Sequence, residues 1–450
     1  MGREGDKGKM DALAGIGVSG GCPLDVRRAV LFRCGCYSLA MECRVSLRAG
    51  LATLARALLP LVVLCCCCNW GAVAQAQGQC EVSRLPAGSL VTFQDDLDFA
   101  GLDGAVDQSL RLLEQLPLER EYRLCGARYT VAELAASLRD FQQLVRQAPD
   151  SQTLGQILAD RFTICQAGSR ERPDRILLTG YFEPLAEGSL TPDSLYRYPL
   201  YRRPADLVER EGAHGREWGR DQDGRFLPYW SRAEIENDHR LAGQELVYLT
   251  DPLAPFIFQV QGSGKVRLLD GSVRRVQFAG KNGRPYRSIG KVLIDEGRLR
   301  RAEVDLPRLV QYLGALPPAE RDRILQTNES YVFFRWGDND EAGPHGCFGV
   351  PLTAGRSLAL DQRCFPPGAL AWVQARKPRV NQAGEIIGWD PFGRFVLNQD
   401  CGSAIVGSGR ADLFWGDGPY AQAAAGAAKH PAALLFLIEK KGLSGPAEIR

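Results

Sequence analysis

Two aspartates flank a loop of small residues near the end of the chain. The apolar stretch Phe395–Leu397 has the length and composition of a strand and leads into Asp400. A Gly-Ser-Gly turn then leads through Asp412 into a second apolar stretch, Leu413–Trp415. The glycines of this segment suit backbone that takes positive φ or lies close against a ligand. The segment therefore predicts two carboxylates at the floor of a groove.

The rest of the chain combines N-terminal helices with many short strands. Apolar residues recur at helical spacing from Cys80 to about Gln166, and a capping box at Thr130 and Glu133 opens one of these helices. Further helices are expected at Asp305–Leu313 and Pro318–Leu325. Strands are expected at Ile176–Pro184, Tyr248–Thr250, Phe256–Val260, Lys265–Leu269, Val276–Ala279, Tyr331–Phe334, Leu370–Val373, Arg394–Leu397 and Ala433–Ile438. This pattern, in a chain of 450 residues, predicts a mainly β (α+β) protein of two domains, a barrel interrupted by a second β domain.

Charge and histidine content exclude several classes of function. The formal net charge is +2, with 55 basic and 53 acidic residues interspersed, so no nucleic-acid partner is predicted. The four histidines are not spaced as metal ligands, which argues against a zinc site and against a Ser-His-Asp triad. We predict no cofactor and no metal, so catalysis has to rely on carboxylates.

The N-terminal region has the pattern of an export signal. Arginines at 44, 48 and 56 precede the apolar run Ala57–Trp70, which small residues follow. The run is short for a membrane span, so a cleaved signal peptide is expected at 41–76, with an uncleaved anchor as the alternative. Residues 1–40 show no periodicity and indicate disorder or a start codon placed too early. The block Cys65–Cys68 leaves lipidation open, although no small residue precedes a cysteine there as a lipoprotein signal requires.

Six cysteines follow the signal: Cys80, Cys125, Cys165, Cys347, Cys364 and Cys401. An even number in an exported chain permits disulfides, but the sequence does not fix their pairing. Cys401 adjoins the groove segment. No histidine lies near it in sequence to form a thiolate, so a small buried apolar residue is favoured over a nucleophile.

Asp412 has the surroundings of a general acid for cleaving a glycosidic bond. Such an acid must be protonated near neutral pH, and moving an aspartate pKa from about 3.9 to about 6 disfavours the charged form by roughly 2.9 kcal/mol. Partial burial against the apolar residues after Asp412 can supply this. Asp400 has polar neighbours, Asn398, Gln399 and Ser403, which are expected to hold it ionised. The alternative for either aspartate is a turn or helix cap.

Other residues are candidates for binding a saccharide. Tyr181 and Trp415 could stack on sugar faces, and Glu183 is a further candidate carboxylate. The loop 261–264, with Gln261 and Ser263, and the loop 280–283 could donate hydrogen bonds to a sugar. Core packing for the aromatic residues and ordinary hairpin turns for the loops are the alternatives.

Seven motifs in register closely resemble the membrane-bound lytic transglycosylase A family of murein-degrading enzymes. The resemblance runs in order from about residue 170 to 435. The motifs are Gly180–Pro184, Tyr198–Pro204, Gln259–Gly264, Gly280–Gly290, Asn328–Phe334, Gly349–Ala359, and Gln399–Ile405 with Arg410–Gly416.

This resemblance implies a fold and a division of the chain. The family has a double-psi β-barrel domain into which a second β-barrel domain is inserted, with the glycan strand in the groove between them. Here the first domain would comprise residues 77–184 and 331–450, and the inserted domain residues 185–330. The C-terminal module of the family, named for three aspartates, would span about 340–420.

The resemblance also implies a mechanism. The three aspartates fall on Asp361, Asp400 and Asp412, and the single acid and base of the family aligns with Asp412. It would protonate the oxygen of the β-1,4 link between N-acetylmuramic acid and N-acetylglucosamine, then accept the proton of the muramyl 6-hydroxyl, leaving a 1,6-anhydro end. Asp400 would orient or stabilise. The chain departs from the family at Cys401, where Thr or Val is usual, at the unusual His345–Cys347 entry to the Gly349 motif, and in lacking a clear lipobox.

A lytic transglycosylase is therefore the leading hypothesis. It predicts an exported, periplasmic monomer that binds peptidoglycan glycan strands, with attachment to the outer membrane left open. A peptidoglycan hydrolase would share the acid but needs a second carboxylate at a set separation. A non-catalytic scaffold that binds glycan in the same groove is the third interpretation.

Overall fold

The computed structural model describes residues 80–85, 91–148, 150–212, 215–337 and 343–442. The predicted signal peptide and the stretch before it lie outside these residues. All of these residues belong to one compact unit. Among the described residues, no helix combines the length and hydrophobicity that a membrane crossing needs.

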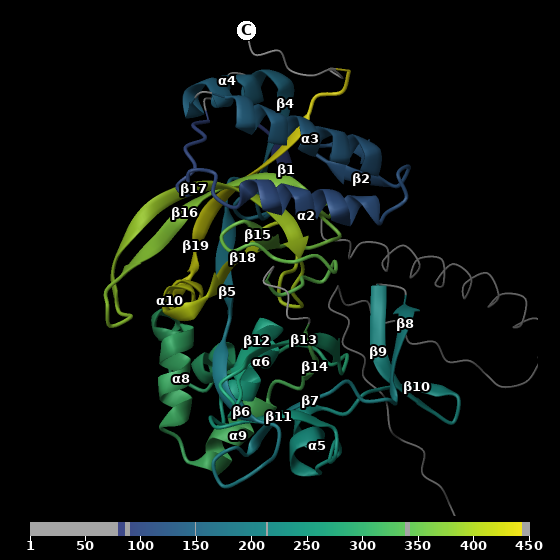
Figure 1. Ribbon diagram of the computed structural model, residues 1–450, viewed down its shortest axis with the longest axis vertical. Helices are drawn as coiled ribbons and strands as arrows, with labels where there is room; N and C mark the ends of the chain where they lie inside the picture. The colour runs from purple at the N-terminus through teal and green to yellow at the C-terminus, as the bar shows by residue number, and fades with distance from the viewer. Residues whose placement is uncertain (1–79, 86–90, 149, 213–214, 338–342, 443–450) are drawn as a thin grey trace, which may run out of the picture. The chain divides into compact units, whose positions relative to one another are not determined.

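Six strands close into a first barrel (Figure 1). In spatial order they are β19 (Lys429–Glu439), β16 (Leu370–Val380), β17 (Ile386–Asp400), β15 (Ser357–Ala359), β18 (Arg410–Asp417) and β5 (Ile176–Glu183), and β5 pairs back onto β19. The strands β4 (Phe162–Ala167) and β1 (Val82–Arg84) extend the sheet beyond β19. Two neighbouring pairs, β15 with β17 and β18 with β5, are parallel. Closure leaves the six strands without free edges and forms a continuous buried core.

The predicted N-terminal helices are present. They are α2 (Leu102–Glu114), α3 (Val131–Gln147) and α4 (Ser151–Arg161), with a hairpin of β2 (Glu121–Leu124) and β3 (Ala127–Thr130) between the first two. The predicted capping box is confirmed, because Thr130 Oγ1 accepts from the Glu133 N–H at 3.2 Å and the Glu133 carboxylate accepts from the Thr130 N–H at 2.7 Å. Helix α2 packs on β17, where the Gln399 amide donates to the Ala105 carbonyl at 2.6 Å. The helices therefore hold the strand that ends at Asp400.

A fully buried ion pair joins the segment before α2 to the barrel. The side chains of Arg356 and Asp95 are both 0% exposed, and the guanidinium donates to both carboxylate oxygens at 2.6 and 2.9 Å. The Phe395 N–H on β17 donates to the same carboxylate at 3.1 Å, and Arg356 also donates to the Ala100 carbonyl. The ion pair thus also provides hydrogen-bond partners for the Ala100 carbonyl and the Phe395 N–H.

We expect Asp95→Ala to lower the free energy of unfolding by about 3–5 kcal/mol, because it leaves the Arg356 charge buried without its partner. Urea denaturation measures the loss. The control is Glu121→Ala, which breaks the exposed ion pair of Glu121 with Arg128 and should cost less than about 1 kcal/mol. Similar small losses in both variants would contradict this assignment.

Six further strands form a second sheet. Their order is β14 (Val332–Trp336), β13 (Val273–Lys281), β12 (Ser263–Arg267), β6 (Leu185–Ser189), β11 (Glu245–Leu249) and β7 (Tyr198–Tyr201). A bridge between Arg202 and Phe334 brings the two outer strands together, so this sheet also curls into a barrel. A three-stranded sheet of β8 (Leu207–Gly212), β9 (Gly215–Gln222) and β10 (Arg225–Pro228) projects from it (Figure 1). Because β14 pairs with β13, the chain leaves the second barrel only after Trp336.

The remaining helices lie mostly between strands of the second barrel. They are α5 (Arg232–Asn237), α6 (Ala254–Gln261), α7 (Ile289–Asp295), the 3-10 turn Arg301–Glu303, α8 (Leu306–Gly314) and α9 (Pro318–Gln326), with α10 (Gly418–Ala427) following β18. The strand predicted at Phe256–Val260 is wrong, since these residues belong to α6. Pro255 in its first turn and Gly262 at its left-handed C-cap delimit a helix, and a short apolar run alone does not distinguish helix from strand.

Candidate active site

A cavity of about 2060 Å³ is lined by residues of both barrels. The first barrel contributes Thr179, Tyr181, Asp400 and Asp412. The second contributes residues 259–263 at the end of α6 and the start of β12, together with Gln277, Lys281 and Tyr286 among others. The two aspartates predicted at the floor of a groove therefore both line one.

Asp412 lies on β18, between Ala359 on β15 and Thr179 on β5. The backbone around it is buried in the barrel wall, and its Oδ1 is buried without a hydrogen-bond partner among the described residues. The pKa of Asp412 is raised to about 6, mainly by burial; hydrogen bonding with Thr179 and the charge of Arg410 oppose the rise, and the charge of Asp400 adds to it. The direction of this shift agrees with the one expected from the sequence, and the catalytic role of Asp412 stays a prediction. The site holds a carboxyl group that can be protonated near neutral pH.

Asp400 ends β17 and accepts three hydrogen bonds. The Tyr181 hydroxyl donates to Oδ2 at 2.8 Å, and the N–H groups of Cys347 and Cys401 both donate to Oδ1 at 2.8 Å. Burial raises the pKa of Asp400, and these three donors reduce that rise because they stabilise the ionised form.

The prediction that Asn398, Gln399 and Ser403 surround the Asp400 carboxylate is wrong. The Asn398 amide donates to the Pro366 carbonyl, the Gln399 amide turns to α2, and Ser403 accepts from Lys281. Adjacent residues in a strand point to opposite faces, and the end of β17 is additionally shifted in register against β15, so sequence neighbours are not contacts here. The donors come instead from segments 219 and 53 residues away, and from the residue that follows.

Three of the predicted binding residues line the cavity. Tyr181 contacts Asp400, and burial followed by the Asp400 charge raises the pKa of its hydroxyl well above the usual value. Gln261 lies at the end of α6, and its Oε1 accepts from the Phe182 N–H at 2.9 Å, which joins the two barrels. Ser263 begins β12 and is nearly buried in the cavity wall.

The other three predicted binding residues do not line the cavity. Glu183 is 2% exposed and pairs with Arg275 at 2.6 Å and Lys265 at 3.7 Å. Trp415 is buried in the first barrel, where its ring packs against Phe392 and Tyr420, so its stacking on a sugar is not supported. It lies one residue beyond Phe414 on a strand whose faces alternate, and it points inward.

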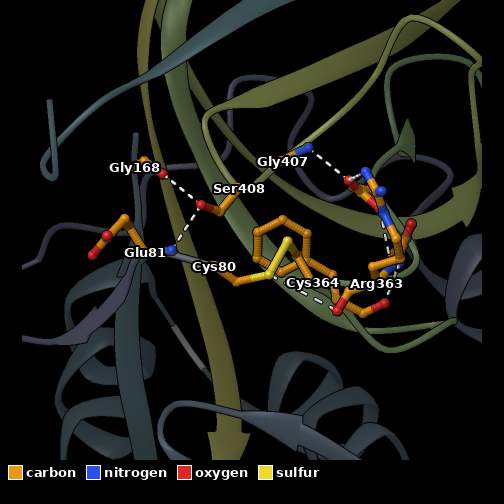
Figure 2. Close-up of a disulfide and its surroundings, with 10 residues drawn as sticks. Cys80, Glu81, Gly168, Arg363, Cys364, Gly407 and Ser408 are labelled. Atoms are coloured by element: carbon orange, nitrogen blue, oxygen red, sulfur yellow. Dashed lines mark hydrogen bonds and ion pairs between the residues drawn. A yellow bond between two sulfur atoms is a disulfide. The ribbon is translucent and has the colours of Figure 1, made fainter. Parts of the chain in front are cut away.

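Asp361, the third predicted binding residue that does not line the cavity, stabilises a loop instead. Its Oδ2 accepts from the Gly407 N–H and from the Arg363 guanidinium, both at 2.6 Å, as Figure 2 shows for the labelled Gly407 and Arg363. Gly407 belongs to the loop between Asp400 and Asp412. Asp361 therefore fixes the backbone of that loop without lining the cavity.

All six cysteines after the predicted signal form disulfides: Cys80–Cys364, Cys125–Cys165 and Cys347–Cys401. Cys401 is therefore neither the simple apolar residue that was favoured nor a free nucleophile. Cys347, Cys401 and Asp400 are close enough to share a metal ion, but the two sulfurs are bonded to each other and are not available as thiolates. The expected absence of a metal or cofactor stays a prediction.

Tyr286 is a cavity residue that the sequence interpretation missed. It belongs to the second barrel, and both Tyr286 and Asp412 line the cavity. Burial raises the pKa of its hydroxyl, Arg232 lowers it, and the charge of Asp412 adds to the rise. The available signal was its position within the motif Gly280–Gly290, which contained the 280–283 loop already considered for sugar binding. The cysteines at 347 and 401 gave no comparable signal, because nothing in the sequence indicated that they pair.

Comparison with known proteins identifies the family. Residues 177–335 match the MltA specific insert domain, and residues 356–438 match the 3D domain. The membrane-bound lytic murein transglycosylase A of Vibrio cholerae is 33% identical over 289 residues, which cover 64% of this chain and 71% of the relative. The chain belongs to the membrane-bound lytic murein transglycosylase A family. The protein of that name from Escherichia coli K12 is 31% identical over 290 residues, with 64% of this chain and 72% of the relative covered.

Solved structures of the lytic murein transglycosylase A family share this fold. A membrane-bound lytic murein transglycosylase from Agrobacterium tumefaciens superposes with a TM-score of 0.64 at 29% identity, covering 80% of this chain and 97% of that one. Escherichia coli MltA with bound chitohexaose gives a TM-score of 0.61 at 25% identity, covering 81% and 96%. The predicted fold, a double-psi β-barrel with a second β-barrel domain, is confirmed, as are the predicted family and the prediction of an enzyme.

We expect Asp412→Asn to stabilise the protein at pH 7. The folded-state pKa of about 6 lies above the ordinary 3.8, so the stability that the proton contributes is complete below about pH 4 and is lost as pH rises through 6. The variant should gain up to about 3 kcal/mol at pH 7 and nothing at pH 4. Urea denaturation at both pH values measures this difference. Asp174→Asn, at an exposed carboxylate, is the control, and a gain that does not depend on pH would contradict the assignment.

Proposed function

We propose that this chain cleaves the β-1,4 bond between N-acetylmuramic acid and N-acetylglucosamine of peptidoglycan, leaving a 1,6-anhydromuramyl end. The observation that carries the proposal is the half-buried Asp412 carboxyl in a cavity lined by both barrels. Its pKa is raised to about 6, and its Oδ1 accepts no hydrogen bond from the part of the chain that the structure describes. The relatives are named lytic murein transglycosylases, and one neighbouring structure holds chitohexaose, a glycan.

In the proposed reaction Asp412 acts first as acid and then as base. Its proton passes to the glycosidic oxygen as the bond from that oxygen to the muramyl anomeric carbon breaks. The muramyl 6-hydroxyl oxygen then bonds to the anomeric carbon and gives its proton to the Asp412 carboxylate. Asp412 thus gives one proton and regains one, no water is consumed, and the enzyme returns to its starting state.

Asp400 has the complementary role in this proposal. Its three hydrogen-bond donors favour the ionised form, and its negative charge raises the pKa of Asp412, which keeps Asp412 protonated. A carboxylate beside the anomeric carbon would also stabilise the positive charge that develops there. Two nearby carboxyl groups with divided protonation states are a recurring arrangement in acid catalysis.

We further propose that the first barrel, formed by β5 and β15–β19, carries the chemistry and that the inserted barrel completes the glycan groove. The boundary expected at residue 331 moves to the end of β14, because β14 (Val332–Trp336) pairs with β13 of the inserted barrel. Three disulfides favour an oxidising compartment, and the relatives are named membrane-bound, which together support an exported, periplasmic protein with attachment to the outer membrane.

We expect Asp412→Asn to lower the rate of release of soluble fragments from purified sacculi by about 10²–10⁴, since amide cannot supply the proton. Mass spectrometry of the wild-type products should find fragments lacking one water. Reducing ends instead would establish the hydrolase. Binding to sacculi that is equal in both proteins, with no fragments released by the wild type, would establish the scaffold.

The rate should fall as pH rises through about 6, because only protonated Asp412 starts the reaction. Asp400→Asn removes a charge that raises the pKa of Asp412, so the same fall should occur at lower pH, together with a lower maximum. Initial rates of fragment release across the pH range measure both curves. An unchanged midpoint in Asp400→Asn would show that Asp400 does not act on the acid.

A further inference from the structure

The Cys347–Cys401 disulfide joins the two backbone segments that hold Asp400. Cys401 directly follows β17, and Cys347 lies in a turn 54 residues earlier. The N–H of each cysteine donates to the same carboxylate oxygen, Oδ1, at 2.8 Å. Both residues line the cavity, and Cys347 is exposed. The covalent bond and the two hydrogen bonds therefore enclose one carboxylate.

The turn around Cys347 is also held by bonds within itself and by two side-chain hydrogen bonds, between His345 Nδ1 and Gln277 Nε2 at 3.0 Å and from the Gln362 amide to Cys347 Sγ at 3.3 Å. The Gly346 N–H donates to the Val350 carbonyl and the Gly349 N–H to the Gly346 carbonyl, both at 2.9 Å. Among the described residues, the bonds that join residues 343–350 to the end of β17 are the Cys347 N–H bond to Asp400 and the disulfide. The turn also lies close, because a Cβ on Gly346 would sit 2.4 Å from the Gln399 carbonyl oxygen.

We propose that the Cys347–Cys401 disulfide is a positioning element of the active site, and that opening it by a dithiol lowers turnover. It keeps the Cys347 N–H on Asp400 Oδ1 while the Tyr181 hydroxyl holds Oδ2, so the carboxylate keeps one orientation beside Asp412. The inference rests on the proposed function, since it concerns the rate of that reaction.

The chemistry of opening is balanced. One thiolate of a dithiol attacks a sulfur of the pair and forms a mixed disulfide, and the second thiol closes a ring and releases both cysteines as thiols. The dithiol loses two electrons and two protons, and the cysteines gain them. Without the disulfide, the Cys347 N–H hydrogen bond to Asp400 is no longer supported by a covalent link between the turn and the end of β17. A shift of about 1 Å in a positioning group can cost about 10² in rate.

The other disulfides provide internal controls. Cys80–Cys364 ties the start of β1 to the segment after Asp361, and Figure 2 shows it beside the bonds of Ser408 with Gly168 and Glu81. Cys80 is exposed, so a reductant reaches this bond too. Cys125–Cys165 is buried beneath the helices. Neither pair contacts Asp400.

The experiment compares the wild type with Cys347→Ala/Cys401→Ala and with Cys80→Ser/Cys364→Ser on soluble glycan strands. The first variant should show kcat lowered about tenfold or more, KM changed less than about twofold, and no further response to dithiothreitol. The second should keep the wild-type kcat and lose it on reduction. Reoxidation should restore the rate in the wild type and in the second variant.

Three results overturn the inference: full kcat in Cys347→Ala/Cys401→Ala, equal losses of kcat in both variants, or a loss that appears only with a lower thermal midpoint. If the first variant does not fold, reduction of Cys80→Ser/Cys364→Ser, with mass spectrometry to identify the opened pair, decides the question. Activity that persists after Cys347–Cys401 has opened would refute the role. An inactive wild type would refute the proposed function instead.

Discussion

The site depends on a carboxyl group that the closed barrel partly shields from water. Leu413 and Ala411 beside Asp412 are fully buried, so the strand cannot move outward to hydrate the carboxyl without exposing core. Keeping Asp412 ionised there costs up to about 3 kcal/mol relative to water, and protonation relieves that cost. The same burial that destabilises the fold at neutral pH gives the group a proton to donate. An exposed edge strand could not impose this, because it could bend to admit solvent.

Ring closure also explains why the aspartates of one module have different roles. Asp412 and Asp400 reach the cavity from strands that are both neighbours of β15, the short strand between them in the ring. Asp361 follows the same short strand but turns behind the loop, where it accepts from the Gly407 N–H. Two carboxylates thus face the cavity while the third fixes the backbone that connects them. The loop from β17 to β18 connects Asp400 to Asp412, and Asp361 is bonded to that loop through the Gly407 N–H.

Local patterns predicted what local interactions determine. The capping box at Thr130 needs only a residue three positions on, and the raised pKa of Asp412 agrees with the apolar residues that follow it in the strand. The surroundings of Asp400 could not be predicted in this way, because its donors Tyr181 and Cys347 reach it only when the barrel closes. Trp415 was misplaced for a related reason, since which face of a strand points to the cavity depends on the ring and not on composition.

The two barrels are joined unequally around the cavity. Where β5 passes into β6, the buried Glu183 pairs with Arg275 of the second barrel, and the Lys265 N–H donates to the Pro184 carbonyl at 2.7 Å. Separating that ion pair would leave a buried charge unpaired, at a cost of about 3–5 kcal/mol. Across the cavity, Lys281 and Ser403 share one exposed hydrogen bond of 3.3 Å, which contributes about 1 kcal/mol or less. The barrels are therefore held more firmly at the Glu183 crossing than through the contact of Lys281 with Ser403.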